Sequence, residues 1–324
     1  MLSSRIVIAL VVIVGVPAAT VGYVALIEWI LGRLAYATRH KLRPWLWLAP
    51  AIILLTVFLI YPSINTIYLS FFNADSSKFV GIENYKTLFT QPTGLITLRN
   101  NLLWLVLLAG IVVTLGLLFA VLFDRVRYEA VAKALIFVPM AISFVAASVI
   151  WKLQYDYKPL GTPQTGTLNG IAVALGGQPI PWLIDSPLNT FMLIIVGVWM
   201  WTGFGLVILS AGLKGIPTEI IEAARVDGAS EFQILTRVTI PMMASTIAVV
   251  ATTMVINALK AFDIVYVMTS GNFSTDVMAN QMYKQMFTFR NFGYASAIAV
   301  VLLLAIVPVM VINVRRFQEQ EMIR

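Results

Sequence analysis

Three polar residues, Asn257, Lys260 and Asp263, are spaced by three within an apolar stretch that runs from residue 242 to 268. This spacing places them on one face of a helix, where the ammonium and the carboxylate can pair and lower the cost of burying either charge. Charged groups inside an apolar helix face a cavity or another helix rather than lipid. Two interpretations stay open: the polar wall of a ligand cavity, and a structural ion pair at a subunit interface.

Segment 199–205 offers a second set of groups for a small polar ligand. A sugar site combines hydrogen-bonding groups with aromatic faces, and this segment supplies the ring of Trp201 and the hydroxyl of Thr202. Gly203 and Gly205 can weaken the helix and expose backbone groups toward a cavity. The same small residues also permit close helix packing, so both interpretations stay open.

Ser143 is a third candidate and lies in the apolar stretch 132–151. Pro139 precedes it and lacks a backbone donor, so it can free a carbonyl group and bend the helix. A hydroxyl beside such a bend is well placed to contact a ligand.

The scarcity of cysteine and histidine excludes several kinds of catalytic and metal-binding site. The chain has no cysteine and therefore no thiol nucleophile, disulfide or thiolate metal site. Its one histidine, His40, stands between basic residues that repel a cation. We therefore expect no catalytic residue, no metal site and no cofactor in this chain.

The composition is that of a membrane protein. Of 324 residues, 60% are hydrophobic and 11% are charged, whereas a soluble domain carries roughly 25% charged residues. The 15 acids and 22 bases cannot cover the surface of a globule of this size. This excludes a soluble enzyme, a disordered chain and a nucleic-acid-binding domain, and it predicts an all-α polytopic membrane protein embedded in lipid.

Seven apolar stretches are long enough to cross a bilayer, which takes about 20 apolar residues per helix. They are residues 6–31, 45–71, 101–123, 132–151, 188–211, 242–268 and 292–314. The first has small residues at Pro17-Ala18-Ala19, as a signal peptide would, but its apolar run continues to Leu31, which favours an uncleaved helix. Segment 154–187 is rich in Gly, Pro and Thr and is expected to be a loop.

Basic residues give the orientation, because lysine and arginine concentrate on the cytoplasmic side. One group of connecting segments holds 13 Lys or Arg residues in 60, and the opposite group holds 8 in 92. The first group is 33–44, 125–133, 212–240 and 315–324, and the second is 1–5, 72–99, 152–187 and 269–291. With seven spans, this predicts an external N-terminus and a cytoplasmic C-terminus.

One cytoplasmic segment, 212–240, is long and contains residues that typically start and end helices. Pro217 suits a first helical turn, and Gly228 suits a left-handed cap at a helix end. Ser230 can cap a second helix that begins at Glu231. The sequence thus predicts two short helices with a glycine bend between them.

These two helices carry the apolar residues Ile220, Ile221 and Phe232 outside the membrane. Exposed apolar side chains on a short helix are typical of a docking site for a partner protein. A plain helical linker is the alternative, and the pattern alone leaves both open.

The same segment resembles the signature of the membrane subunits of binding-protein-dependent ABC importers. That signature is Glu-Ala-Ala, three residues, Gly, nine residues and Ile-x-Leu-Pro. This chain has Glu222-Ala223-Ala224, then Gly228, then Val238-Thr239-Ile240-Pro241, with the same spacing and two conservative replacements. The resemblance extends from about residue 45 to 318.

The resemblance implies a type I importer permease with a six-helix core at 45–318, an extra span and basic linker at 1–44, and a cytoplasmic tail at 319–324. The loop 212–241 would dock into a cytoplasmic ATPase subunit. The docking residues would be Glu222, Ala223, Ala224, Asp227, Gly228, Phe232 and Pro241. The implied partners are a second homologous permease, two ATPase subunits that bind ATP and Mg²⁺, and an external solute-binding protein, at a bacterial inner membrane.

The chain looks like the carbohydrate-uptake branch and is similar to the larger maltose-type permease. Its extra span and the run 191–263 look like permeases for α-glucosides and glucosylglycerol, which implies a sugar or glycoside substrate. The residues that match or adjoin the sugar contacts of that permease are Ser143, Trp201, Thr202, Gly203, Asn257, Ala258, Lys260 and Ala261. The charge of Lys260 departs from the pattern of that permease.

Two other functions are open from the residues alone. An ion-coupled transporter would use Lys260, Asp263 and Asp124, but it leaves the loop at 222–241 unexplained. An integral-membrane enzyme needs clustered acids, histidines or cysteines. The sequence has no Gly-x-x-x-x-Gly-Lys-Ser/Thr phosphate loop, so an importer would bind ATP on a separate subunit.

Overall fold

The computed structural model describes the backbone of residues 2–124 and 126–322, and the side chains of 11–124, 126–308, 310 and 311. The regular secondary structure of these residues consists of α-helices with short 3₁₀ and π segments, and no strand is formed among them. This confirms the predicted all-α class. The chain divides into two compact units, Met1–Thr66 and Ile67–Arg324.

The first unit is a helical hairpin in which one carboxylate bridges the two helices. Its elements are α1 (Leu2–Gly32), α2 (Tyr36–Leu55), the π-helical turn η1 (Thr56–Ile60) and the start of α3 (Tyr61–Leu69). Glu28 on α1 accepts hydrogen bonds from Arg43 Nε at 2.9 Å and from Trp47 Nε1 at 3.0 Å, both on α2. These bonds tie the two helices together near their turn.

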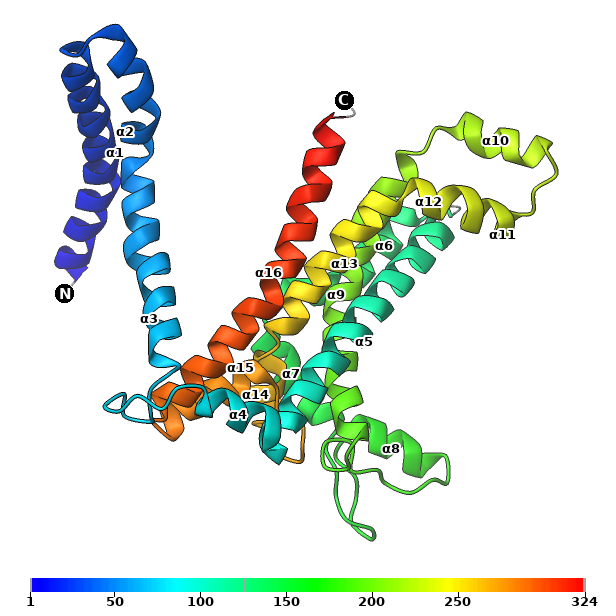
Figure 1. Ribbon diagram of the computed structural model, residues 1–324. Coiled ribbons are helices and arrows are strands. Elements are labelled where there is room, and N and C mark those ends of the chain that lie inside the picture. Colours follow the sequence, from blue (N-terminus) through cyan, green and yellow to red (C-terminus); the bar gives the residue numbers. More distant parts are fainter. Residues whose placement is uncertain (1, 125, 323–324) are drawn as a thin grey trace. The chain divides into compact units, whose positions relative to one another are not determined.

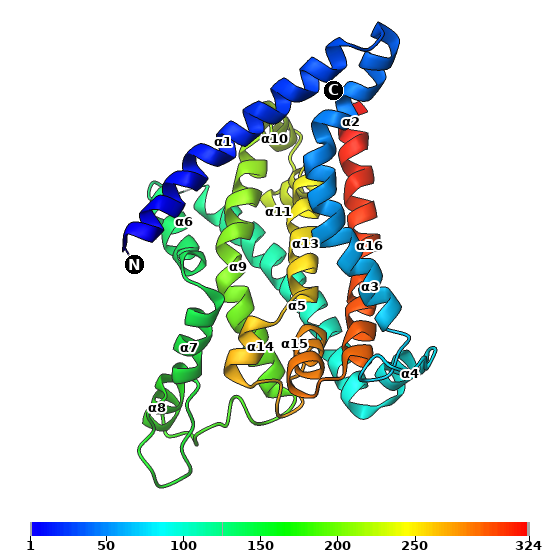
Figure 2. The same ribbon diagram turned by 90° about the vertical axis from the view of Figure 1, so that its left-hand side faces the viewer.

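The second unit is a set of long helices with short helices at both ends. Its elements are α4 (Glu83–Thr90), α5 (Pro92–Phe123), α6 (Glu129–Phe137), η2 (Val138–Ala141), α7 (Phe144–Gln154), α8 (Thr167–Ala174), α9 (Leu188–Lys214), α10 (Thr218–Val226), α11 (Glu231–Ile234), η3 (Leu235–Thr239), α12 (Ile240–Met242), α13 (Ala244–Leu259), α14 (Asp263–Met268), α15 (Met278–Tyr283), η4 (Lys284–Thr288) and α16 (Phe292–Met322). The helices α10–α12 lie at one end of this unit, and α4, α8, α14 and α15 lie at the other (Figures 1 and 2).

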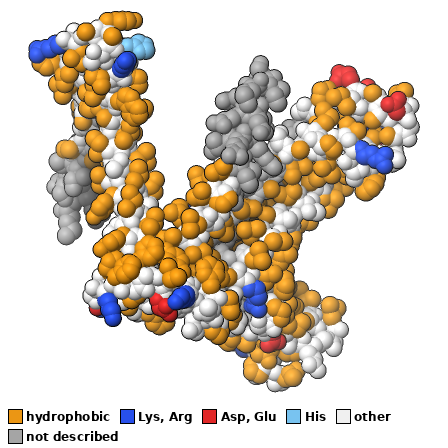
Figure 3. Space-filling model, in the orientation of Figure 1, with side chains coloured by type: hydrophobic (Ala, Val, Ile, Leu, Met, Phe, Trp, Pro, Cys, Tyr) orange, Lys and Arg blue, Asp and Glu red, His pale blue; other side chains and the backbone are white. Residues whose placement is uncertain are grey.

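Figure 3 shows charged side chains near α10–α12 and, at the opposite end, near α4, while the face between them is mainly hydrophobic. Four helical stretches are long and apolar enough to cross a membrane: Val11–Gly32, Tyr36–Leu69, Pro92–Phe123 and Leu188–Lys214. Two bent pairs raise the number to as many as six, and Phe292–Pro308 is a shorter apolar helix. Each of the seven predicted stretches therefore lies mainly in helical structure.

Two predicted spans are broken rather than continuous. In 132–151, the helices Glu129–Ala141 and Phe144–Gln154 meet at 98°. Pro139 sits in the 3₁₀ turn at this break and cannot supply the backbone donor that a continuous helix needs. In 242–268, the helices Glu231–Met242 and Ala244–Leu259 meet at 71°. The same span is interrupted again where α13 ends at Leu259 and α14 begins only at Asp263.

Segment 154–187 is not entirely a loop, because it contains α8. Asn169 on α8 is completely buried. Its Nδ2 donates to the carbonyl oxygens of Asp156 at 2.9 Å and Ile180 at 3.0 Å, and its Oδ1 accepts from Trp182 Nε1 at 3.1 Å. These bonds hold α8 in place, and they explain why a segment whose Gly, Pro and Thr content predicts a loop contains a short helix.

Close contact between α5 and α9 forms the centre of the second unit. A Cβ atom added at Gly116 on α5 would lie 2.8 Å from the carbonyl carbon of Gly205 on α9. The two backbones can approach this closely only because neither residue has a side chain. Trp104, Leu108 and Val112 continue the same face of α5 into the buried core.

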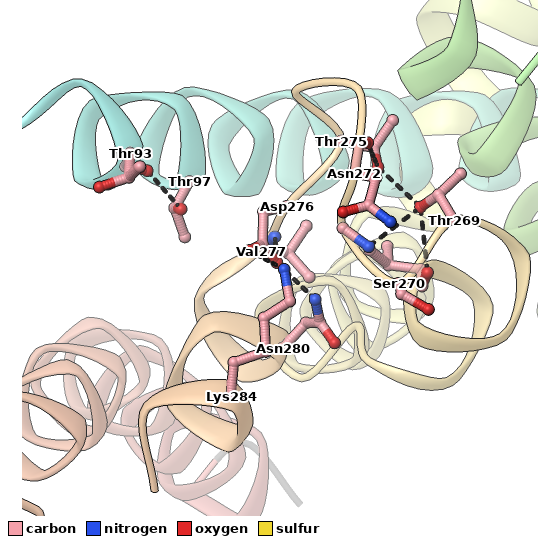
Figure 4. A network of polar contacts seen from close by, with 12 residues as sticks. Thr93, Thr97, Thr269, Ser270, Asn272, Thr275, Asp276, Val277, Asn280 and Lys284 are labelled. Carbon is pink, nitrogen blue, oxygen red and sulfur yellow. Dashed lines mark hydrogen bonds and ion pairs between the residues drawn. The ribbon is translucent and has the colours of Figure 1, made fainter. Parts of the chain in front are cut away.

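A buried polar network holds the end of the unit that carries α14 and α15 (Figure 4). Asn100 Nδ2 on α5 donates to the carbonyl oxygens of Ser274 at 2.7 Å and Asp276 at 2.9 Å. The carboxylate of Asp276 accepts from Asn280 Nδ2 at 2.5 Å and from Lys284 Nζ at 3.0 Å. This network positions the segment that follows α14, and sequence analysis missed it although Asp276, Asn280 and Lys284 have helical spacing.

The α5–α9 contact makes a prediction for two glycines of the same helix. Gly116→Leu is expected to lower the thermal stability of the detergent-solubilised protein, because overpacking typically costs about 1–3 kcal/mol. Gly110→Leu is the matched control, since a Cβ atom there would meet nothing within 4 Å. Equal melting temperatures for the two variants would show that the close contact is not needed.

Candidate functional site

A cavity of about 150 Å³ lies among α5, α7, α9 and the junction of α13 with α14. Its lining comprises Trp104, Leu108, Phe144, Gly197, Trp201, Asn257, Lys260, Ala261, Phe262, Asp263 and Ile264. Both broken helices reach it, because Phe144 is the first residue of α7 and residues 260–262 join α13 to α14. Inside a membrane, backbone that leaves the helix is tolerated where it lines a cavity or is buried in protein.

The three polar residues spaced by three meet at this cavity, but not on one helical face. Lys260 is the C-terminal cap of α13, and Asp263 starts α14, so the helix ends between them. Among the described residues no ion pair joins Lys260 to Asp263. The predicted common face is therefore wrong, whereas the convergence of Asn257, Lys260 and Asp263 on one space is observed.

Asn257 keeps an acceptor available at the cavity. Its Nδ2 donates to the carbonyl oxygen of Thr253 at 2.9 Å. No donor in the described part of the chain occupies its Oδ1. Trp201 provides an aromatic wall, with its ring centroid 5.8 Å from that of Phe144. The cavity thus combines aromatic faces with polar groups, as sites for small polar ligands do.

Three predicted site residues point into the protein core instead. Thr202 is 5% exposed, and its hydroxyl donates to the carbonyl oxygen of Val198 at 2.6 Å. A Cβ atom at Gly203 would lie 2.6 Å from the carbonyl oxygen of Ile136, so this glycine permits close packing of α9 on α6. Ala258 is completely buried. None of the three lines the cavity.

Ser143 lies at the break between α6 and α7. Its hydroxyl caps α7 by accepting from the backbone nitrogen of Ala146 at 3.1 Å. The serine does not itself line the cavity, but it starts the helix whose first residue, Phe144, does. Sequence analysis missed Trp104, Leu108 and Gly197, and a lone tryptophan in the apolar stretch 101–123 is the signal that was available.

The two-helix prediction for loop 212–240 is confirmed. Gly228 bends the chain between α10 and α11 with φ of +82°. Ser230 forms a capping box with Gln233: its hydroxyl accepts from the Gln233 nitrogen at 3.3 Å, and its own nitrogen donates to Gln233 Oε1 at 2.8 Å. Pro217 stands one residue before the helix, as its N-cap, rather than in the first turn.

Apolar side chains on this loop are open to the surroundings. Val226 is 87% exposed and Phe232 is 74% exposed. Asp227, Gly228, Ala229, Gln233, Arg237 and Val238 border a hollow of about 370 Å³. Arg225 Nε donates to Glu231 Oε1 at 2.9 Å, and this hydrogen bond raises the pKa of Arg225. The ion pair links the end of α10 to the start of α11 and braces the loop.

A charged cluster connects the start of this loop to the broken helix α6–α7. Lys214, the last residue of α9, donates to Glu129 Oε2 at 2.8 Å. Lys133 donates to both Glu129 and Ser210. The end of α9 is thereby fixed to α6, and α6 leads to the break beside the cavity.

The fold and the site are those of a membrane subunit of a transporter, because broken helices border a cavity with aromatic walls and three polar residues, and a braced helical loop lies at one end. Residues 112–319 match the family of binding-protein-dependent transport system inner membrane components. The chain belongs to this family, and it is a permease, the non-catalytic membrane component of an ABC importer. This membership favours the importer over the ion-coupled transporter and the membrane enzyme.

Relatives with reported roles are similar over most of the chain. The osmoprotective compounds uptake permease protein GgtC of Synechocystis sp. is 57% identical over 279 residues, which cover 86% of this chain and 100% of GgtC. The alpha-glucoside transport system permease protein AglF of Rhizobium meliloti is 46% identical over 277 residues, which cover 85% of this chain and 82% of AglF.

A solved structure supports the fold. A chain of a bacterial alginate ABC transporter, in complex with an alginate pentasaccharide-bound periplasmic protein, matches with a TM-score of 0.72 and 22% identity. The match covers 86% of this chain and 96% of that chain. The two proteins therefore share the permease fold.

The bend at Gly228 predicts different outcomes for two substitutions. A Cβ atom at Gly228 meets nothing within 4 Å, so only the left-handed backbone restricts the residue. Gly228→Val is expected to cost about 1–2 kcal/mol locally and to speed trypsin cleavage at Arg225 and Arg237. Gly228→Asn, which tolerates this conformation, should be cleaved like the wild type. Equal rates for all three proteins would contradict the bend.

Proposed function

We propose that this permease moves an α-glucoside or a glycosylated osmolyte such as glucosylglycerol into the cytoplasm. The observation that carries the proposal is the cavity at the two helix breaks, which has aromatic walls and polar groups suited to a sugar. The printed roles of GgtC and AglF, uptake of osmoprotective compounds and of alpha-glucosides, support the same substrate class. The sugar would contact Trp201, Asn257, Lys260 and Ala261 from α9 and the α13–α14 junction.

The assembly that we propose has this chain beside a second homologous permease, two ATPase subunits and an external solute-binding protein. ATP and Mg²⁺ would bind to the ATPase subunits, and this chain would hold no cofactor. Its permease core would be 45–318, with the N-terminus outside the inner membrane and the C-terminus in the cytoplasm. Loop 212–241 would dock on an ATPase subunit through Glu222, Ala223, Ala224, Asp227, Gly228, Phe232 and Pro241.

Transport would proceed by alternating access, driven because ATP binds one state of the assembly more tightly than the other. Movement of the docked loop would reach α9 at Lys214. From there, the Lys214–Glu129 and Lys133–Ser210 contacts would pass it to α6. Since α6 leads to the break beside Phe144, the cavity would change shape as the loop moves.

Asn257→Ala tests the sugar site. The substitution removes an amide that borders the cavity, and one hydrogen bond contributes about 0.5–1.5 kcal/mol, so uptake efficiency for sucrose should fall about 3- to 10-fold. The measurement is sucrose uptake into proteoliposomes that contain the complete importer. Assembly and basal ATP hydrolysis serve as controls and should not change, because the Asn257 side chain bonds only within its own helix among the residues that the structure describes. Unchanged uptake kinetics would remove Asn257 from the site.

Phe232→Ser tests the docking loop. An exposed aromatic anchor at an interface typically contributes at least 1–2 kcal/mol, so the fraction of ATPase subunit that co-purifies should fall about 10-fold. The matched control is Leu175→Ser, which changes a residue that is 83% exposed and follows α8, the helix at the opposite end of the unit (Figure 1). Equal retention of the ATPase by both variants would contradict docking at this loop.

A further inference from the structure

The turn between α1 and α2 is strongly basic. Residues 28–43 hold four Lys or Arg residues and one acid, a net charge of +3 with His40 neutral. The bases are Arg33, Arg39, Lys41 and Arg43, and all but the half-buried Arg39 are exposed. Figure 3 shows basic and histidine side chains gathered at this turn. Both helices are long and apolar enough to cross a membrane, so the turn that joins them lies at a membrane surface.

Three exposed tryptophans flank this turn, Trp29 on α1 and Trp45 and Trp47 on α2. Tryptophan is enriched at the level of the lipid headgroups, because its ring is apolar and its N–H group can reach water. The guanidinium carbon of Arg33 lies 3.5 Å from the centroid of the Trp29 ring. A guanidinium that stacks on a ring keeps its N–H edges available for a phosphate. The tryptophans thus place the bases at the depth of the lipid phosphates.

An apolar hollow lies beside one of these bases. It has a volume of about 350 Å³ and is lined by Arg43, Pro44, Trp47 and Leu48. Basic residues next to a span also set its orientation, and charge alone serves that purpose. Three apolar side chains beside one cation match a lipid instead, since a lipid carries acyl chains next to an anionic phosphate.

The carboxylate of Glu28 holds the arrangement in place before a ligand arrives. It accepts from Arg43 Nε at 2.9 Å and from Trp47 Nε1 at 3.0 Å. Within the described residues, the Nη atoms of Arg43 make no hydrogen bond, and the side chains of Arg33 and Lys41 have neither a hydrogen bond nor an ion pair. Free donors on a side chain that is already fixed lose little freedom when they bind.

We propose that the α1–α2 turn binds an anionic phospholipid, with the phosphate at Arg43 and an acyl chain in the hollow at Trp47 and Leu48. Arg33 and Lys41 add attraction for the charge of the headgroup. A basic residue near an anionic membrane surface contributes about 1 kcal/mol, which is about a fivefold change in affinity. This binding is independent of the transported substrate.

The test places a fluorophore beside the hollow. Ala51→Cys gives the full-length chain its only thiol, and Ala51 shares a face of α2 with Trp47 and Leu48. The labelled chain is titrated in detergent micelles with phosphatidylglycerol that carries a nitroxide on an acyl chain, and with phosphatidylcholine that carries the same nitroxide. Phosphatidylglycerol should quench the fluorophore at a lower mole fraction than phosphatidylcholine does.

A double variant tests the contribution of the bases. Arg33→Gln with Lys41→Gln removes two charges that do not hold the hairpin together. It should raise the mole fraction of phosphatidylglycerol needed for half-quenching about 25-fold and leave that of phosphatidylcholine unchanged. The matched control is Lys78→Gln, which removes the same charge from an exposed lysine of the second unit and should change neither value.

Four results would overturn the lipid site. Equal quenching by the two lipids would show that the hollow takes up acyl chains without regard to charge. An unchanged value for phosphatidylglycerol in the double variant would show that the bases do not act on the lipid. Reversal of the quenching by glycerol phosphate at matched ionic strength would indicate a site for free phosphate. Loss of the ATPase subunit from the double variant, with lipid binding unchanged, would indicate a protein partner at the turn.

Discussion

The structure depends on one constraint: a chain in lipid has no water to satisfy its backbone, so every amide must be paired within the protein. Long helices meet this requirement, and any interruption must be sheltered. The second unit has interruptions at 138–143 and at 260–262, and Phe144, which follows the first, lines the same cavity as residues 260–262. The cavity and the helix breaks therefore depend on each other. Non-helical backbone is tolerated in a membrane where it borders a cavity, and the breaks bring polar groups to that cavity.

A rigid framework lets the ends of the unit act on this centre. The uninterrupted helix α9 runs from the cavity, at Gly197 and Trp201, to Lys214, where the braced loop begins. Its close contact with α5 through Gly116 leaves little room for sliding. The ionic contact of Lys214 with Glu129 adds α6 to the same body. A displacement of the loop would therefore move α9 and α6 together and shift the break before α7.

The sequence predicts the features that are set by residues close together in the chain, namely the helices, their caps and the bend at Gly228. Hydrophobic runs gave the helices, and the Gly228 bend and the Ser230 cap follow from preferences of single residues. The break after Leu259 was not predictable, because no proline or glycine marks it. Thr202 and Ala258 were assigned to the site although they face the core, since the face of a helix that meets a cavity is set by its packing partners. The position of Trp104 at the cavity likewise depends on α9, which packs against its ring at Gly197.

The central claim, that the unwound junction of α13 and α14 lines a water-accessible substrate path, is tested most directly by labelling an introduced thiol. The chain has no cysteine, so a single substitution gives this subunit one reactive site. Ala261→Cys at the cavity should react with a membrane-impermeant maleimide in the assembled importer and be protected by sucrose. Ala258→Cys, at a fully buried position one turn away, should not react. Labelling of Ala261→Cys only by a lipid-soluble maleimide, without protection by sucrose, would contradict the account.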